Sequence, residues 1–139
     1  MEYIQSMIAA LNNGNGKYKF ELKLNDAGIV TLEPTDINIG IPTTILSFYG
    51  HVHSLKIFSP RSFEIFSMSE ITWRGPFVSF SKINSNSIGF DCRKINSAGE
   101  WDIVNLDTKF VITKTLASYL TNKMWAWINR GRLVWCQEY

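Results

Sequence analysis

The chain has 139 residues and a net charge of +2, from 14 basic and 12 acidic residues. A chain of this length forms one domain with a core of its own, and a hydrophobic content of 45% excludes disordered, collagen-like and coiled-coil proteins. The net charge is too small to indicate binding to nucleic acid or to an anionic membrane, whereas five tryptophans are many for this length.

The N-terminus has neither the basic region nor the long apolar run of a secretory signal. Apolar stretches reach only about five residues, far below the roughly 20 that span a bilayer. Without a signal peptide, Cys92 and Cys136 are expected to be reduced thiols rather than a disulfide. These features predict a cytoplasmic protein without a membrane segment.

The first 42 residues predict a helix, a hairpin and a loop. Residues 3–12 have apolar positions at helical spacing, and the glycines and asparagines of residues 13–16 end that helix. Strict alternation over residues 17–24 predicts a half-buried strand whose apolar side faces the core. A turn at residues 25–28 and a returning strand at residues 29–32 complete the hairpin, and residues 33–42 are expected to form a loop. The core-facing residues of the first strand are expected to be Tyr18, Phe20, Leu22 and Leu24.

The remaining chain predicts a short helix, a series of strands and a long closing helix. Pro42 suits the start of a helix over residues 43–49. Leu116, Leu120, Met124 and Trp127 recur at helical spacing, with Thr113 or Thr115 placed to cap the helix and Gly131 to end it. Leu133–Cys136 is an apolar tail that we expect to pack back on the domain. The predicted strands, joined by turn-length connections, are residues 54–58, 63–66, 77–80, 87–91, 101–104 and 110–112.

This order predicts an α+β fold. A mostly antiparallel sheet of about six short strands is expected to pack against the N-terminal helix and the long C-terminal helix. No internal repeat or linker interrupts the chain, so the prediction is a single domain over residues 1–139.

A search for catalytic or metal-binding patterns finds only weak candidates, and we expect neither a cofactor nor a metal. His51 and His53 lack the further ligands of a zinc site, and we expect both to be solvated. Cys92 precedes two cations that could lower its pKa, but its place in the strand pattern predicts that it faces the core. Glu100 and Asp102 flank Trp101 and are expected to share a solvated face, with the Trp101 side chain on the opposite face, toward the core. Together these features predict a protein that is not an enzyme.

The aromatic and basic residues near the C-terminus are better candidates for binding. Residues 71–139 carry nine basic and five acidic side chains. At 100° per residue, Trp125 points about 140° away from the apolar stripe of the last helix, so it packs either under the tail or against a partner. Trp73 lies in a stretch expected to be a loop. Because tryptophan and arginine are enriched at binding hot spots, the predicted partner-binding residues are Trp73, Trp125, Arg130 and Arg132.

Residues 41–130 resemble the SUKH superfamily, which includes the yeast regulators of cell-wall glucan synthesis and many bacterial toxin-immunity proteins. The resemblance lies in fold motifs, none of them catalytic. The segments that carry it are Ile41–Tyr49, which has the pattern of a Leu-Pro step and an aromatic-rich helix, Ser54–Phe58, Phe63–Ile71, Ser87–Asp91, Trp101–Val104 with Asp107, and the closing helix.

The resemblance implies a SUKH-like binding domain without catalysis. The expected function is an immunity protein that neutralises a toxin, and the expected partner is a protein, either a toxin domain or a component of cell-wall synthesis. The oligomeric state is expected to be a monomer or a weak homodimer. Three alternatives remain: a regulator of cell-wall glucan synthesis, a carbohydrate-active protein that uses Glu100 and Asp102, and nucleic-acid binding by the basic C-terminal half.

Overall fold

The computed structural model describes residues 2–25 and 40–137. Its helical elements are α1 (Glu2–Asn12), α2 (Thr43–His51), α3 (Leu116–Ser118), the π-helical turn η1 (Tyr119–Lys123) and α4 (Met124–Arg130). Its strands are β1 (Lys19–Leu24), β2 (Val52–Ser59), β3 (Phe63–Ile65), β4 (Thr72–Arg74), β5 (Phe77–Ile83), β6 (Asn86–Asp91), β7 (Asp102–Asn105) and β8 (Val111–Thr113). We refer to α3, η1 and α4 together as the C-terminal helix.

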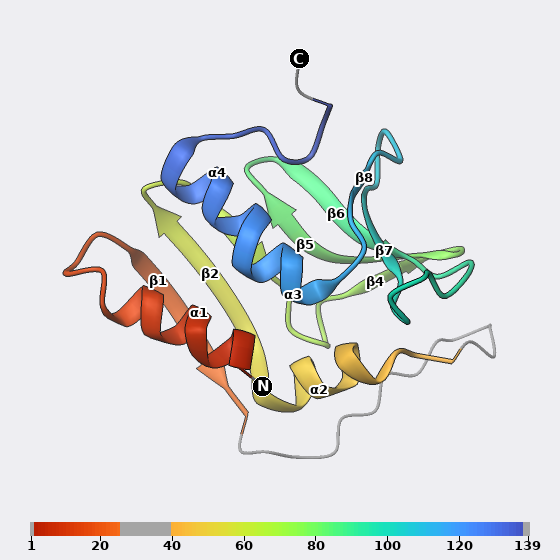
Figure 1. Cartoon of the computed structure of the whole chain (residues 1–139), viewed down its shortest axis with the longest axis horizontal. Helices are drawn as coiled ribbons and strands as arrows, with labels where there is room; N and C mark the ends of the chain where they lie inside the picture. The colour runs from red at the N-terminus through yellow and green to blue at the C-terminus, as the bar shows by residue number, and fades with distance from the viewer. Residues whose placement is uncertain (1, 26–39, 138–139) are drawn as a thin grey trace.

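Helices pack against an antiparallel sheet, which confirms the predicted α+β class (Figure 1). Within the described residues the sheet has eight strands in the order β1-β2-β3-β5-β6-β7-β8, and β4 pairs with β5 beside β3. Every strand pair is antiparallel. In Figure 1, α1 and the C-terminal helix lie on the same face of the sheet.

Two details differ from the predictions, and a third prediction lies partly outside the described residues. Trp73 lies on strand β4, opposite Val78, and not in a loop. Strand β1 pairs with β2, and the predicted return strand at residues 29–32 lies outside the described residues. Leu24 is 55% exposed, because β1 is irregular between Lys23 and Leu24 and the alternation ends there.

Most of the five tryptophans are explained by packing in the core or against it. Trp101 and Trp127 are buried, as we expect from the sequence, and Trp135 packs edge-on against Trp127 with ring centroids 4.8 Å apart. Phe80 and Phe90 stack at 3.9 Å. A fully buried hydrogen bond of 2.7 Å joins the hydroxyls of Ser81 and Tyr119 across the sheet–helix interface.

The C-terminal helix has the predicted pattern but contains an irregular turn. The Oγ1 atom of Thr115 accepts a hydrogen bond from the Ser118 amide, and Gly131 ends the helix in the left-handed conformation with φ of 68°. All four residues of the predicted apolar stripe are buried. The π-helical turn η1 departs from the regular helical repeat. Trp125, in α4, is half-buried and packs against Tyr18.

The residues after the helix, 132–137, which we call the closing tail, pack back on the domain as predicted. Asn105 is buried in β7, and its Nδ2 atom donates a 3.0 Å hydrogen bond to the carbonyl oxygen of Trp135. Together with the Trp127–Trp135 contact, this bond fixes the path of the tail next to the C-terminal helix.

Four strands place charged residues of alternating sign side by side. Glu21 pairs with Lys56, Lys56 with Glu64, and Glu64 with Lys82. The Nζ atom of Lys56 lies 3.9 Å from Oε2 of Glu64. Opposite charges on neighbouring strands stabilise a sheet by about 0.2–1 kcal/mol per pair. Cross-strand pairing therefore explains this row of charges without a binding function.

Candidate functional site

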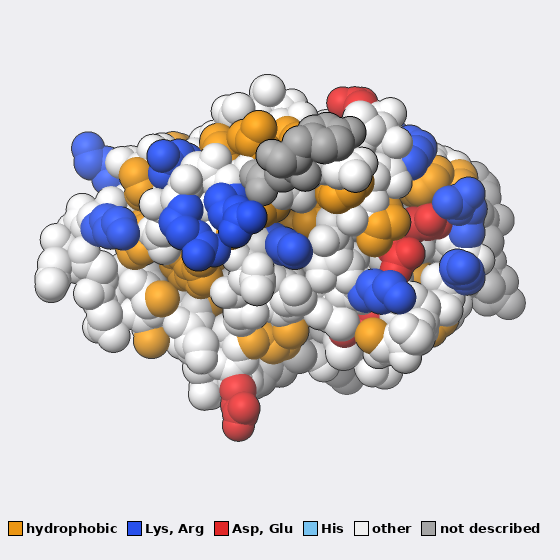
Figure 2. Space-filling model, turned by 45° about the horizontal axis from the view of Figure 1, so that its top comes forward, with side chains coloured by type: hydrophobic (Ala, Val, Ile, Leu, Met, Phe, Trp, Pro, Cys, Tyr) orange, Lys and Arg blue, Asp and Glu red, His pale blue; other side chains and the backbone are white. Residues whose placement is uncertain are grey.

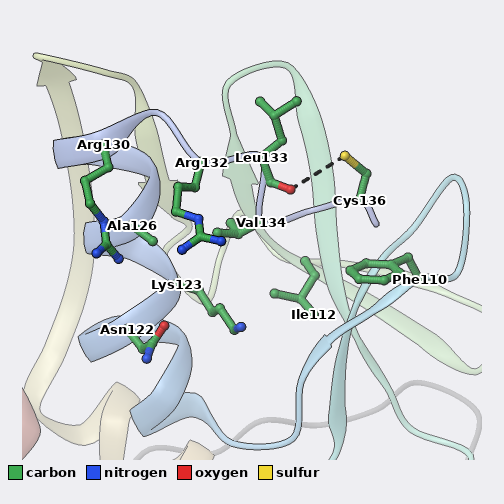
Figure 3. A pocket seen from close by; sticks show the side chains of 10 residues that line it. All are labelled: Phe110, Ile112, Asn122, Lys123, Ala126, Arg130, Arg132, Leu133, Val134 and Cys136. Atoms are coloured by element: carbon green, nitrogen blue, oxygen red, sulfur yellow. Dashed lines mark hydrogen bonds between the residues drawn. The ribbon is translucent and has the colours of Figure 1, made fainter. Parts of the chain in front are cut away.

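A cavity of about 220 Å³ lies between the C-terminal helix, the start of β8 and the closing tail (Figure 3). We call it the C-terminal groove. The residues that line it are Phe110, Ile112, Asn122, Lys123, Ala126, Arg130, Arg132, Leu133, Val134 and Cys136.

Local periodicity explains why these side chains meet. Phe110 and Ile112 are two residues apart in extended chain and therefore point to the same side. Asn122, Ala126 and Arg130 are spaced by four residues on the helix and therefore share one face. The two faces oppose each other across the groove, and the tail closes the third side.

The floor of the groove is apolar. Ile112 and Ala126 are buried, and Phe110 and Val134 are half-buried and pack against the core. Leu133 is 44% exposed at the outer edge. Since apolar surface gains free energy when it leaves water, this floor favours the binding of an apolar side chain.

The rim of the groove is cationic. Lys123 extends from the helix toward the facing strand, and Arg132 lies between the tail and the helix (Figure 3). Arg130 lies on the exposed last turn of α4. Among the described residues that line the groove, none is acidic. Figure 2 shows Lys and Arg side chains gathered on part of this face, with hydrophobic side chains between them. The groove therefore has a positive field that attracts anionic groups.

The end of α4 is held in place by contacts with the β2–β3 turn. The Nη1 atom of Arg61 donates a 2.9 Å hydrogen bond to the carbonyl of Ile128, and its guanidinium lies 5.7 Å from the centre of the Trp127 ring. The indole nitrogen of Trp127 donates a 2.8 Å hydrogen bond to the carbonyl of Ser62. A groove that is formed before binding avoids the entropic cost of ordering its walls.

The four predicted partner-binding residues do not form one site. Arg130 and Arg132 both line the groove. Trp125 is not among the residues that line the groove, and its ring packs against Tyr18 with centroids 5.3 Å apart. Trp73 is half-buried on β4 and packs against the core. The two arginines therefore share the lining of the groove, whereas neither tryptophan belongs to it.

The apolar floor is the part of the groove that the sequence does not predict. Local patterns place Phe110 and Ile112 in a strand and Val134 in an apolar tail. Ile112 lies in β8, Phe110 lies immediately before it, and Val134 lies in the tail. The meeting of these residues depends on how the tail folds across the end of the sheet, and no local pattern encodes that path. Lys123 belongs to the basic C-terminal region in the sequence, but its place beside the floor is set by the tertiary structure.

Glu100 is not on a solvated face, which corrects the sequence prediction. It is 8% exposed, and its Oε1 atom accepts a 3.0 Å hydrogen bond from the Leu116 amide. The amide groups at the start of a helix lack partners within the helix and favour negative charge, so Glu100 caps the C-terminal helix. Asp102 instead accepts a hydrogen bond of 2.9 Å from the side chain of Asn96.

The other chemical candidates have structural roles. Cys92 is buried, as predicted, and burial together with the nearby Asp91 raises the pKa of its thiol to about 12. His51 ends α2, where its Nδ1 atom lies 2.8 Å from the carbonyl of Ser47, and His53 is exposed on β2. Within residues 2–25 and 40–137 there is no group of three His, Cys, Asp or Glu side chains that could hold a metal ion.

Comparison with known proteins found no match to a family model, to a curated protein or to a solved structure. The resemblance of residues 41–130 to the SUKH superfamily therefore stays a prediction. In the same two described ranges, none of the helices combines the length and the apolar character needed to cross a membrane.

Proposed function

We propose that the protein is a non-catalytic binding module and that it holds a protein partner in the C-terminal groove. The observation that carries this proposal is the preformed groove itself, which combines an apolar floor with a cationic rim. Protein interfaces have the same organisation, with an apolar centre that is shielded from water by a polar edge.

The size and lining of the groove favour a protein partner over a small-molecule substrate. Pockets for drug-sized ligands measure roughly 300–1,000 Å³, whereas this cavity measures about 220 Å³. The described lining residues include neither a carboxylate nor an imidazole, the groups that most often transfer protons in enzymes. A site of this kind suits an anchoring side chain better than a reaction.

The specific function that we propose is that of an immunity protein, which neutralises a toxin by binding it. The support is the resemblance of residues 41–130 to the SUKH superfamily, together with a groove that is suited to one protein surface. Regulation of cell-wall glucan synthesis through protein binding is the second candidate, because the same resemblance also includes such regulators.

The proposal is tested by capturing partners from a native lysate with three forms of the chain. One form is wild type, one is the groove variant K123E/R130E, and one is the control variant K17E/K94E. Lys17 and Lys94 are exposed and lie outside the groove, so the control has the same change of net charge.

We expect wild type and control to retain the same protein and the groove variant to lose it. Equal capture by all three forms would show that the groove is not the binding site. The captured protein is then expressed in a host with and without this chain. An immunity function predicts that growth stops without the chain and resumes with it, whereas unchanged growth would favour the regulatory alternative.

A further inference from the structure

The C-terminal groove also indicates the chemistry of the segment that occupies it. We propose that this segment is an acidic stretch of a protein, in which one apolar side chain is flanked by carboxylates. The inference rests on the proposed function and specifies which part of the partner is recognised.

The floor determines the central residue of the segment. Phe110, Ile112 and Val134 present apolar surface to the cavity. A charged side chain placed on this floor would lose its hydration without gaining a partner there. An apolar side chain instead removes both its own surface and that of the floor from water, so the anchoring residue is apolar.

The rim determines the flanking residues. Lys123 is on the helix side of the floor and Arg132 on the tail side, and Arg130 extends the cationic surface along α4. Because the rim of the groove is positive, carboxylates that flank the apolar anchor are attracted to it. Complementary charge of this kind accelerates association and discriminates against neutral or basic segments.

A nucleic acid fits this site less well. Non-specific affinity for nucleic acid comes from cations that follow an extended backbone, and single strands also require exposed aromatic rings on which the bases stack. The groove is a short cavity with three cations rather than an extended row of them. Among its described lining residues, Phe110 is the one with an aromatic ring, and it is half-buried. The acidic protein segment is therefore the occupant that the observations favour.

The test uses synthetic peptides and NMR spectroscopy of the isotope-labelled full chain. The probe contains Glu-Leu-Glu between Gly-Ser flanks, and its matched controls contain Gln-Leu-Gln, Glu-Ser-Glu or Lys-Leu-Lys. A single-stranded and a duplex DNA oligonucleotide are titrated in parallel. The measured quantities are the dissociation constant and the set of backbone amides whose signals shift.

We expect the Glu-Leu-Glu peptide to shift amides of Phe110, Ile112 and Ala126. Its affinity should fall about tenfold when both glutamates are replaced by glutamine, and about tenfold in K123E/R130E. The control K17E/K94E should bind within about twofold of wild type. The inference is wrong if Gln-Leu-Gln or Lys-Leu-Lys binds equally well, or if Glu-Leu-Glu causes no shifts at about 1 mM peptide. Tighter binding of either oligonucleotide in the groove would assign the site to nucleic acid.

A second experiment separates failure of this inference from failure of the proposed function. A photo-cross-linking amino acid replaces Asn122, an exposed residue of the groove, and mass spectrometry identifies the attached segment of the captured partner. Capture that depends on the groove, but with a cross-linked segment that lacks carboxylates, would overturn the inference and leave the binding function intact. Capture that does not depend on the groove would overturn both.

Discussion

Replacing Asn105 by alanine is expected to loosen the closing tail and with it one side of the groove. The Asn105 side chain is buried and makes three hydrogen bonds. Its Nδ2 atom donates to the carbonyl of Trp135 at 3.0 Å, and its Oδ1 atom accepts from the amides of Asp107 and Thr108 at 3.0 and 3.4 Å. The bond to Trp135 is the one that joins the sheet to the tail.

The expected loss of stability depends on where these partners lie. Asp107 and Thr108 are exposed, so water can replace the side-chain oxygen at their amides at little cost. The carbonyl of Trp135 lies beside the half-buried indole ring and is harder to solvate. With about 0.5–1.5 kcal/mol for each bond, and more for a partner left buried, N105A should lower the free energy of unfolding by about 1.5–3 kcal/mol.

Two measurements test this expectation. Urea unfolding should show a lower midpoint with an unchanged slope, because the surface exposed on unfolding stays the same. Hydrogen exchange should accelerate at the amides of Val134 and Cys136, whose hydrogen bonds lie within the tail. The matched variant is T108A, which removes the 3.3 Å bond from the Phe110 amide in the same turn without touching the tail.

Wild-type exchange rates for the tail amides of N105A would refute the reasoning, because the tail would then be held by other contacts. The same conclusion would hold if N105A and T108A had equal effects on tail exchange. If the reasoning is correct, N105A should also weaken partner capture although it changes no residue that lines the groove.

Three further predictions concern groups outside the groove. E100A should destabilise the domain to urea by about 1–3 kcal/mol because a helix amide loses its buried acceptor, whereas E100Q keeps an acceptor and should cost less; equal stability of E100A and wild type would contradict the capping role. Hydrogen bonds from Ser67, first from its side chain and then from its backbone, hold the pKa of Glu70 below its usual value of 4.5. The stability that Glu70 contributes should therefore be present above pH 4.5 and lost as the pH falls through its lower folded-state pKa, and the stability–pH curve of E70Q should be flatter there; identical acid curves would argue against it. Because burial raises the pKa of the Cys92 thiol to about 12, the variant C136S should react with a thiol reagent at pH 8 only after unfolding, and rapid labelling of native C136S would show that Cys92 is accessible.

Periodicity in the sequence is sufficient to predict the regular helices and most strands. Helix α1, the C-terminal helix with its Thr115 cap and Gly131 end, and most strands lie close to their predicted bounds. These patterns are reliable because an element that buries one face needs apolar residues at its own repeat distance. The packing of the apolar tail and the core positions of Trp101 and Trp127 are predicted by the same reasoning.

Elements without such a repeat cannot be predicted from the sequence and become evident only in the tertiary structure. Strand β4 has only three residues around Trp73 and is a strand because β5 offers it a partner. The π-helical turn η1 departs from the regular helical repeat that the apolar spacing predicts. The alternation of its neighbours predicts a solvated Glu100, and only the position of the helix start next to it explains its burial.

Composition and periodicity thus determined the fold class, the core and the basic character of the C-terminal end, including Arg130 and Arg132. Tertiary structure decided which of these features form a site. Phe110, Lys123 and Val134 lie on three separate segments that meet only when the tail folds back over the end of the sheet. A local pattern predicts which face of a segment is buried. Which buried faces meet depends on contacts between segments that are far apart in the sequence.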